Sequence, residues 1–327
     1  MKLAGKNILV TGAAGFIGSH LSDKLSDMSI GKLVVLDNMY LGRHANLDNT
    51  RLKCQNLVEY LDLKYSTANY DVMEEIFAKE SIDVVFDLAT IPLPASLEDP
   101  KWCFEEITAM AVNLAELCRK GAFKTFIHCS TSEVYGTARY APMDENHPWD
   151  ARTSYAAAKG AADLCVRSYV TTYGIDAFIV RPFNTYGPRQ NDGNYAGVIP
   201  IFLNQILNGE QSRVFGDGEQ SRDFTFVTDT AEGFVKLAES DYTPGEIINL
   251  AAGFEISVNE LGSLIYGEKN KKFSPLYLAE RPGDVRRHSA GVERLKTLTD
   301  FKADVSMKKG LAETLAWYEK KHRQDIK

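Results

Sequence analysis

The chain has 327 residues, of which 44% are apolar and 25% charged, so it is long enough for one large domain and an additional lobe. Its formal net charge is −7, which argues against nucleic acid or an anionic membrane as the main partner. The five cysteines include no Cys-x-x-Cys pair, so neither a disulfide framework nor a zinc site is expected. No stretch has the length and apolar character of a signal peptide or a membrane span. We therefore expect a soluble, cytoplasmic protein without a metal.

The N-terminal part of the chain alternates strand, turn, helix and strand around three glycines. Residues 6–10 and 32–36 predict short buried strands, and residues 19–25 predict an amphipathic helix. Gly12, Gly15 and Gly18 form the turn, and Asp37 follows roughly 20 residues later, at the end of the second strand. Such a turn leaves a helix N-terminus free for a pyrophosphate, while the acid accepts hydrogen bonds from a ribose. The pattern predicts a dinucleotide site, with NAD favoured over NADP because Asp37 repels a 2′-phosphate. The alternative is a structural glycine turn in another α/β protein.

Strands and helices continue to alternate as far as residue 180. We predict strands over residues 56–61, 82–86, 123–129 and 177–180, and helices over residues 70–79, 102–120 and 154–173. This alternation is typical of an α/β fold built on a Rossmann-type, doubly wound parallel sheet.

Beyond residue 180 the pattern becomes less regular. Residues 184–194 are rich in Gly, Pro, Asn and Tyr and predict a loop, and residues 216–218 predict a turn. We expect helices over residues 198–207, 228–239, 258–265 and 311–318, a short strand at 224–226, and a late strand of the main sheet at 247–250. A smaller C-terminal substrate lobe would then be interleaved with the first domain. The predicted division is 1–180 plus about 223–252 for the dinucleotide domain, and about 181–222 plus 253–327 for the lobe.

Polar residues follow the strand predicted over residues 123–129. Thr131, Ser132 and Glu133 come directly after it, where open α/β sheets bind their ligands. Tyr155 and Lys159 are four residues apart on a predicted helix and therefore share one face. A nearby ammonium favours the phenolate, so we expect a lowered pKa for Tyr155. The alternatives are a solvated helix pair for Tyr155 and Lys159 and a loop cap for Glu133.

The combination of Gly12-x-x-Gly15-x-x-Gly18 with Tyr155-x-x-x-Lys159 resembles the extended short-chain dehydrogenase/reductase family. Within it, the similarity is to the nucleotide-sugar epimerases, 4,6-dehydratases and decarboxylases, and it covers nearly the whole chain. The resemblance implies an NAD-dependent enzyme that oxidises C4 of a nucleoside-diphosphate sugar. Tyr155 would take the proton of the C4 hydroxyl, Thr131 would bond the same oxygen, and Lys159 would hold the nicotinamide ribose.

The resemblance also implies binding residues and a homodimer formed by the helices that begin near residues 102 and 154. Implied NAD contacts are Gly12, Gly15, Phe16, Ile17, Gly18, Asp37, Asn38, Asp62, Leu63, Leu88, Ala89, Thr90, Tyr155 and Lys159. Implied contacts with the diphosphate are Asn184, Arg222 and Arg281, and those with the base and ribose are Val198, Val214 and Phe215. The alternative for the two arginines is surface ion pairing.

Glu133 bears on which reaction follows the oxidation. Once C4 is a ketone, the C5 proton is acidic and a carboxylate can remove it as general base. Similar dehydratases carry Thr-Asp-Glu or Thr-Ser-Glu here, whereas 4-epimerases more often have a small residue at the Glu133 position. Because Thr131-Ser132-Glu133 fits the second form, a 4,6-dehydratase is expected first.

Several alternatives remain at this point. Thr-Ser-Glu also occurs in decarboxylases acting on nucleotide uronates, and 4-epimerisation and release of the 4-keto sugar are open as well. A non-catalytic NAD-binding sensor is a further alternative, because the chain departs from the family at two positions. Asp87 stands where the family usually has His, and the region around Ile107 lacks the usual helix asparagine.

Overall fold

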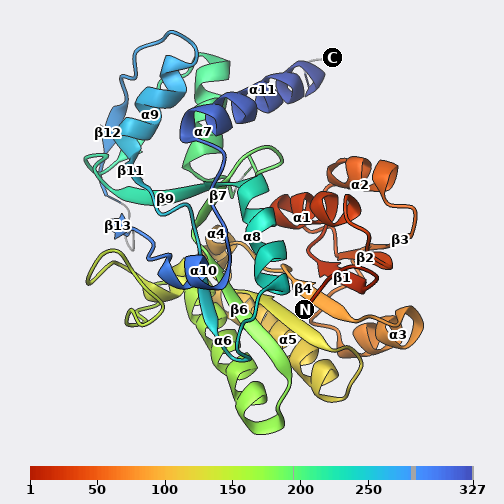
Figure 1. Ribbon diagram of the computed structural model, residues 1–327. Coiled ribbons are helices and arrows are strands. Elements are labelled where there is room, and N and C mark those ends of the chain that lie inside the picture. The colour runs from red at the N-terminus through yellow and green to blue at the C-terminus, as the bar shows by residue number, and fades with distance from the viewer. Residues whose placement is uncertain (194, 281–284, 326–327) are drawn as a thin grey trace.

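The computed structural model describes residues 1–193, 195–280 and 285–325 (Figure 1). Among these residues, a seven-stranded parallel sheet has the order β10-β6-β5-β4-β1-β2-β3. The strands are Asn7–Thr11 (β1), Lys32–Asp37 (β2), Leu57–Leu61 (β3), Val84–Asp87 (β4), Thr125–Cys129 (β5), Asp176–Pro182 (β6) and Ile247–Leu250 (β10). The order reverses at β1, so the crevice beyond the carboxyl ends of β1 and β4 is where such a sheet binds its ligand. The predicted doubly wound α/β fold is confirmed.

Helices cover both faces of this sheet because its strands are apolar on both sides. Ile8 and Val10 point to the face covered by Phe16–Ser26 (α1) and Val227–Glu239 (α8). Leu9, between them, points to the opposite face. Three helices cover that face: Tyr70–Glu80 (α3), Pro100–Arg119 (α5) and Ser154–Tyr173 (α6). The ends of α6 match the sequence prediction, and Thr153 caps its first turn by accepting from the backbone N–H of Ala156.

A second, smaller core lies in the C-terminal part of the chain, at the top of Figure 1. Its strands are Asn184–Tyr186 (β7), Arg213–Phe215 (β8), Ser221–Phe226 (β9), Glu255–Ser257 (β11), Leu276–Leu278 (β12) and Arg287–His288 (β13). Strands β7, β11 and β13 each pair with β9, and β8 pairs with β12. The helices are Val198–Asn208 (α7), Val258–Gly267 (α9) and Met307–Asp325 (α11). The prediction of a loop over residues 184–194 is wrong for β7, because pairing with the distant β9 makes those three residues a strand.

Shorter helical elements lie between these strands and helices. They are His44–Leu47 (η1), Asp48–Lys53 (α2), Leu93–Glu98 (α4), Ser132–Tyr135 (η2) and Glu293–Leu298 (α10). The chain crosses back from β9 into α8, which packs against α1, and then into β10 of the main sheet. The division into two domains at particular residues stays a prediction.

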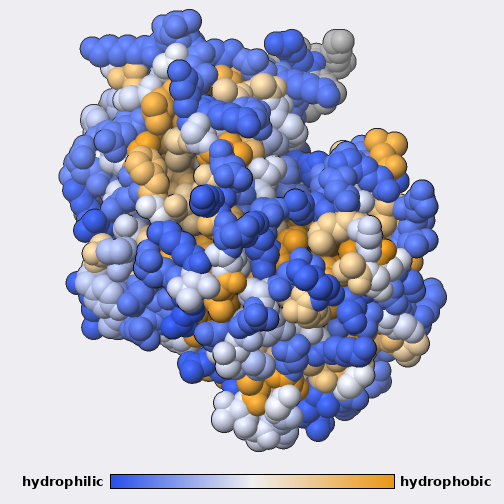
Figure 2. Space-filling model, in the orientation of Figure 1, coloured by the Kyte–Doolittle hydropathy of each residue, from blue (hydrophilic) through white to orange (hydrophobic). Residues whose placement is uncertain are grey.

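The visible surface is mostly hydrophilic, with apolar residues in separate small groups (Figure 2). None of the helices in the described ranges combines the length and apolar character needed to cross a bilayer.

Candidate active site

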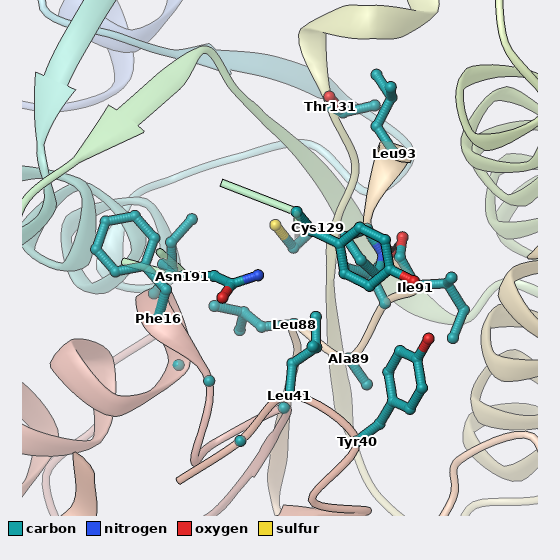
Figure 3. Close-up of a pocket in the computed structure, with 18 of the residues that line it drawn as sticks. Phe16, Tyr40, Leu41, Leu88, Ala89, Ile91, Leu93, Cys129, Thr131 and Asn191 are labelled. Carbon is teal, nitrogen blue, oxygen red and sulfur yellow. Dashed lines mark hydrogen bonds between the residues drawn. The ribbon is translucent and has the colours of Figure 1, made fainter. Parts of the chain in front are cut away.

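A cavity of about 560 Å³ lies at the carboxyl ends of the central strands (Figure 3). It is bordered by the glycine turn, the loops after β2 and β4, the end of β5, the start of α6 and residues 182–185, 189–191 and 195–197. The predicted site residues that line it are Gly12, Gly15, Phe16, Ile17, Gly18, Asp37, Asn38, Leu88, Ala89, Thr90, Thr131, Ser132, Glu133, Tyr155, Lys159 and Asn184. Residues that the sequence pattern assigned to cofactor and to chemistry therefore share one cavity.

The glycine turn is shaped by close backbone contacts. Gly12 has φ +63°, and a Cβ there would lie 2.8 Å from the carbonyl oxygen of Leu88. A Cβ on Gly18 would overlap the carbonyl oxygen of Gly12, so only glycine lets α1 begin this close to β1. Gly15 occupies the N-cap of α1, which leaves the first backbone N–H groups of that helix accessible to an anion. This cradle fits the pyrophosphate of a dinucleotide.

Asp37 closes the same turn from the end of β2. One carboxylate oxygen accepts from the backbone N–H of Ala14 at 2.9 Å, and the other accepts from that of Met39 at 2.8 Å. Burial raises the pKa of Asp37, and these backbone N–H groups oppose the rise. A carboxylate has about four acceptor sites, so lone pairs remain for the hydroxyl groups of a ribose in the cavity. The residues present therefore fit NAD.

Tyr155 and Thr131 meet at the other end of the cavity. Burial raises the pKa of Tyr155, whereas a hydrogen bond with Thr131 lowers it. The Lys159 ammonium donates to the carbonyl oxygen of Cys129 at 2.8 Å and is itself buried. The expected lowering of the tyrosine pKa is therefore wrong for the protein by itself, because removal of a phenolate from water outweighs the favourable contacts. Thr131 also accepts from the backbone N–H of Glu133 at 3.2 Å, which starts the short turn η2.

Asp87, which stands where the family usually has His, belongs to a buried polar network. The Thr11 hydroxyl donates to one Asp87 carboxylate oxygen at 2.9 Å and accepts from the backbone N–H groups of Leu88 and Ala89. His128 lies opposite Asp87 in the β4–β5 register, and its Nδ1 is 2.8 Å from the other carboxylate oxygen. Asp87 thus anchors the loop after β4, whose residues line the cavity.

The network continues on the other side of His128. Its Nε2 lies 3.8 Å from one oxygen of Asp163, whose other oxygen accepts from Ser130 at 2.9 Å and from Arg181 at 2.6 Å. The Asp163 and Arg181 side chains are fully buried. Because Ser130 precedes Thr131, this ion pair holds the strand end on which the site is built.

Other predicted contacts lie away from the cavity or outside the described residues. Asp62 and Leu63 follow β3; the backbone N–H of Asp62 donates to the Asp37 carbonyl, and Leu63 is 75% exposed. The predicted contacts Val198, Val214, Phe215 and Arg222 belong to α7, β8 and β9 and do not line the cavity. Arg281 lies outside the described residues. Binding roles for all of these stay predictions.

Sequence reasoning missed the segment that borders the cavity opposite the sheet. Arg189 pairs with Asp23 of α1 at 2.7 Å, and the Tyr195 hydroxyl donates to Glu98 of α4 at 3.0 Å. Residues 189–191 and 195–197 line the cavity as a result. The Gly-, Pro-, Asn- and Tyr-rich composition of this segment was the available signal, because long ordered loops are often functional.

Residues 8–251 match the sequence model of the NAD dependent epimerase/dehydratase family. The chain belongs to this family. A putative UDP-glucose 4-epimerase of Methanocaldococcus jannaschii is 32% identical over 317 residues, covering 97% of this chain and 99% of that protein. A UDP-N-acetyl-alpha-D-glucosaminuronate decarboxylase of Bacillus cytotoxicus is 32% identical over 329 residues, covering 96% and 98%.

A solved structure resembles the whole chain as well. It is the UDP-N-acetylglucosamine 4-epimerase from Methanobrevibacter ruminantium M1 in complex with UDP-N-acetylmuramic acid, with 35% identity and a TM-score of 0.88. The match covers 98% of this chain and 100% of that one. The chain is therefore an NAD-dependent enzyme of the nucleotide-sugar epimerase, dehydratase and decarboxylase group, which confirms the predicted family and cofactor. When bound, NAD supplies an acceptor for a hydride that can later be returned to the sugar.

Proposed function

We propose that this enzyme is a UDP-sugar 4-epimerase, which oxidises C4 of the sugar and reduces it again from the opposite face. The observation that carries the proposal is that Thr131, Tyr155 and Lys159 line one cavity with the dinucleotide-binding glycine turn. The 4-epimerase names of several full-length relatives support this reaction over the 4,6-dehydration expected first from the sequence.

The roles of the side chains follow from where they lie. Tyr155 accepts the proton of the C4 hydroxyl during oxidation and returns it during reduction, so the two half-reactions balance. Thr131, which hydrogen-bonds Tyr155, holds the same sugar oxygen. Because burial raises the pKa of Tyr155, its phenolate needs a positive charge, which Lys159 supplies from one helix turn away. Asn184 contacts the diphosphate from the cavity wall, with Arg222 and Arg281 as further predicted contacts.

A 4,6-dehydratase is the second candidate, and one observation favours it. Glu133 lines the cavity two residues from Thr131, where a carboxylate can take the C5 proton of a 4-keto sugar. Simple epimerisation has no use for this base. Assembly as a homodimer through α5 and α6 remains a family-based expectation.

The deciding experiment incubates the enzyme and NAD with UDP-, dTDP-, GDP- and CDP-sugars, hexuronates included, in deuterated water, followed by mass spectrometry. Epimerisation predicts a product of unchanged mass without deuterium at C5. Dehydration predicts the loss of water with deuterium incorporated, and decarboxylation of a uronate predicts the loss of carbon dioxide. A Glu133→Gln variant should retain epimerisation but lose dehydration. If no nucleotide sugar binds or reacts, the proposed function is wrong.

A further inference from the structure

An apolar wall borders the catalytic end of the cavity. It consists of Ile91, Pro92, Leu93 and Pro94, which follow β4, and Met110 of α5, all of which line the cavity. Ile91 and Met110 are only 2% and 4% exposed and belong to the apolar cluster against which Tyr155 packs. Figure 3 draws Leu93 at the same end of the cavity as Thr131. A sugar whose C4 oxygen reaches Thr131 and Tyr155 therefore places neighbouring carbons against this wall.

The wall is stiff. Pro92 is the N-cap of α4, with φ −72° and ψ 150°, and Pro94 lies in the first turn of that helix. The backbone N–H of Ala95 donates to the Pro92 carbonyl at 3.0 Å, and the Ser96 hydroxyl donates to the Leu93 carbonyl at 2.6 Å. Proline restricts its own φ and the conformation of the preceding residue. The Leu93 side chain is therefore presented to the cavity by a backbone that cannot easily turn it away.

The charges at this end of the cavity do not suit an acidic sugar. The Lys159 ammonium already donates to the Cys129 carbonyl. Among the described cavity residues, the other two cations are Arg43 and Arg189, and both form ion pairs, with Asp192 at 3.3 Å and Asp23 at 2.7 Å. A carboxylate on C5 would therefore lose water against apolar side chains, which is strongly unfavourable.

We propose that the apolar wall makes the sugar subsite selective for nucleotide sugars whose hexose is uncharged, and that it excludes those whose sugar is a hexuronate. This inference rests on the proposed function and specifies its substrate class: C5 carries a hydroxymethyl or methyl group rather than a carboxylate. It also excludes decarboxylation, because that reaction needs the C5 carboxylate as its leaving group. Leu93 is the residue of the wall at which specificity is most readily changed, since it is only partly buried.

The test compares UDP-glucose with UDP-glucuronic acid, which differ only in the group on C5. Binding of each to the NAD-loaded enzyme is measured by calorimetry, with UDP as the reference ligand. We expect UDP-glucose to bind roughly 100-fold more tightly than UDP-glucuronic acid, given the cost of burying an unpaired carboxylate. Equal or tighter binding of UDP-glucuronic acid would overturn the selectivity while leaving the proposed function intact. If neither sugar nucleotide nor UDP binds, both fail.

A charge introduced into the wall gives a second, independent test. In the Leu93→Arg variant, the guanidinium can pair with a C5 carboxylate, so the preference for UDP-glucose should fall by roughly 10-fold or more. The matched control is Leu97→Arg on the same helix, where the side chain is 68% exposed and does not line the cavity. This control should leave the preference unchanged. A Leu93→Arg enzyme with normal melting temperature and NAD binding but an unchanged preference would refute the assignment of the wall to the sugar subsite.

Discussion

Replacement of Asp163 by Asn tests the buried ion pair beneath the active site. Asp163 lies on α6, four residues after Lys159, and accepts from Arg181 at 3.0 Å through Nε and 2.6 Å through Nη2. Both side chains have no exposed surface, and the Arg181 guanidinium also lies over the rings of Tyr135 and Trp149. Asparagine keeps the size of the side chain but leaves the guanidinium buried without its counter-charge.

The expected loss of folding stability is large because the ion pair is buried away from water. Removal of one partner of a buried ion pair costs about 3–5 kcal/mol. For a protein of 327 residues, this corresponds to a fall in melting temperature of roughly 4–7 °C. Ser130 also loses a charged acceptor, and it directly precedes Thr131. Turnover per folded molecule should therefore fall as well, with the affinity for NAD less affected.

The assay is thermal unfolding followed by circular dichroism, together with turnover measured below the transition. The control is Glu105→Gln, which breaks the pair with Lys101, where both side chains are well exposed. Such an exposed pair contributes little to stability, because water and salt screen it. Replacement of both partners, Asp163→Asn with Arg181→Met, should cost less than the sum of the single changes, because no unpaired charge remains. A shift for Asp163→Asn no larger than that of the control would refute the reasoning.

Three further predictions concern the catalytic tyrosine, the glycine turn and a buried histidine. Tyr155→Phe should lower turnover by about 10²–10⁴-fold while sparing NAD binding, as measured by steady-state assay and cofactor titration; unchanged turnover would exclude Tyr155 as the proton carrier. Gly18→Ala should lower stability and NAD affinity, because the new Cβ overlaps the Gly12 carbonyl, whereas Gly267→Ala in α9, with nothing within 4 Å, should be neutral or slightly stabilising. Burial is the main cause, and the charge of Arg222 the second, that lowers the pKa of His288 from 6.5 to about 3. Between pH 6.5 and 3, the histidine therefore binds a proton in the unfolded chain but not in the folded one. Stability should consequently fall as the pH falls from 6.5 towards 3, and urea midpoints at pH 7 and 4.5 should differ less for His288→Phe; an equal difference would contradict the neutral, buried state.

The sequence alone specified the main sheet and the family because both depend on local patterns. Runs of apolar residues set the strands β1, β2 and β5. The N-cap Thr153 marks the start of α6, and Gly174, in a left-handed conformation, marks its end. The spacing of Gly12, Gly15 and Gly18 identified the dinucleotide turn because those glycines answer a local steric demand. Thr131, Tyr155 and Lys159 could be named for the same reason, since each stands at a definite place on a strand end or helix face.

Tertiary structure decided features that join distant segments. Asp87 departs from the family pattern, and only the register of β4 and β5 shows that it pairs with His128. The three-residue strand β7 exists because it pairs with β9, and no local pattern marks it. Burial by the whole fold, not the neighbouring Lys159, sets the direction of the Tyr155 pKa. The wall at Leu93 likewise became visible only once α4, α5 and the end of β5 enclosed one cavity, because enclosure depends on which surfaces meet and local sequence does not record it.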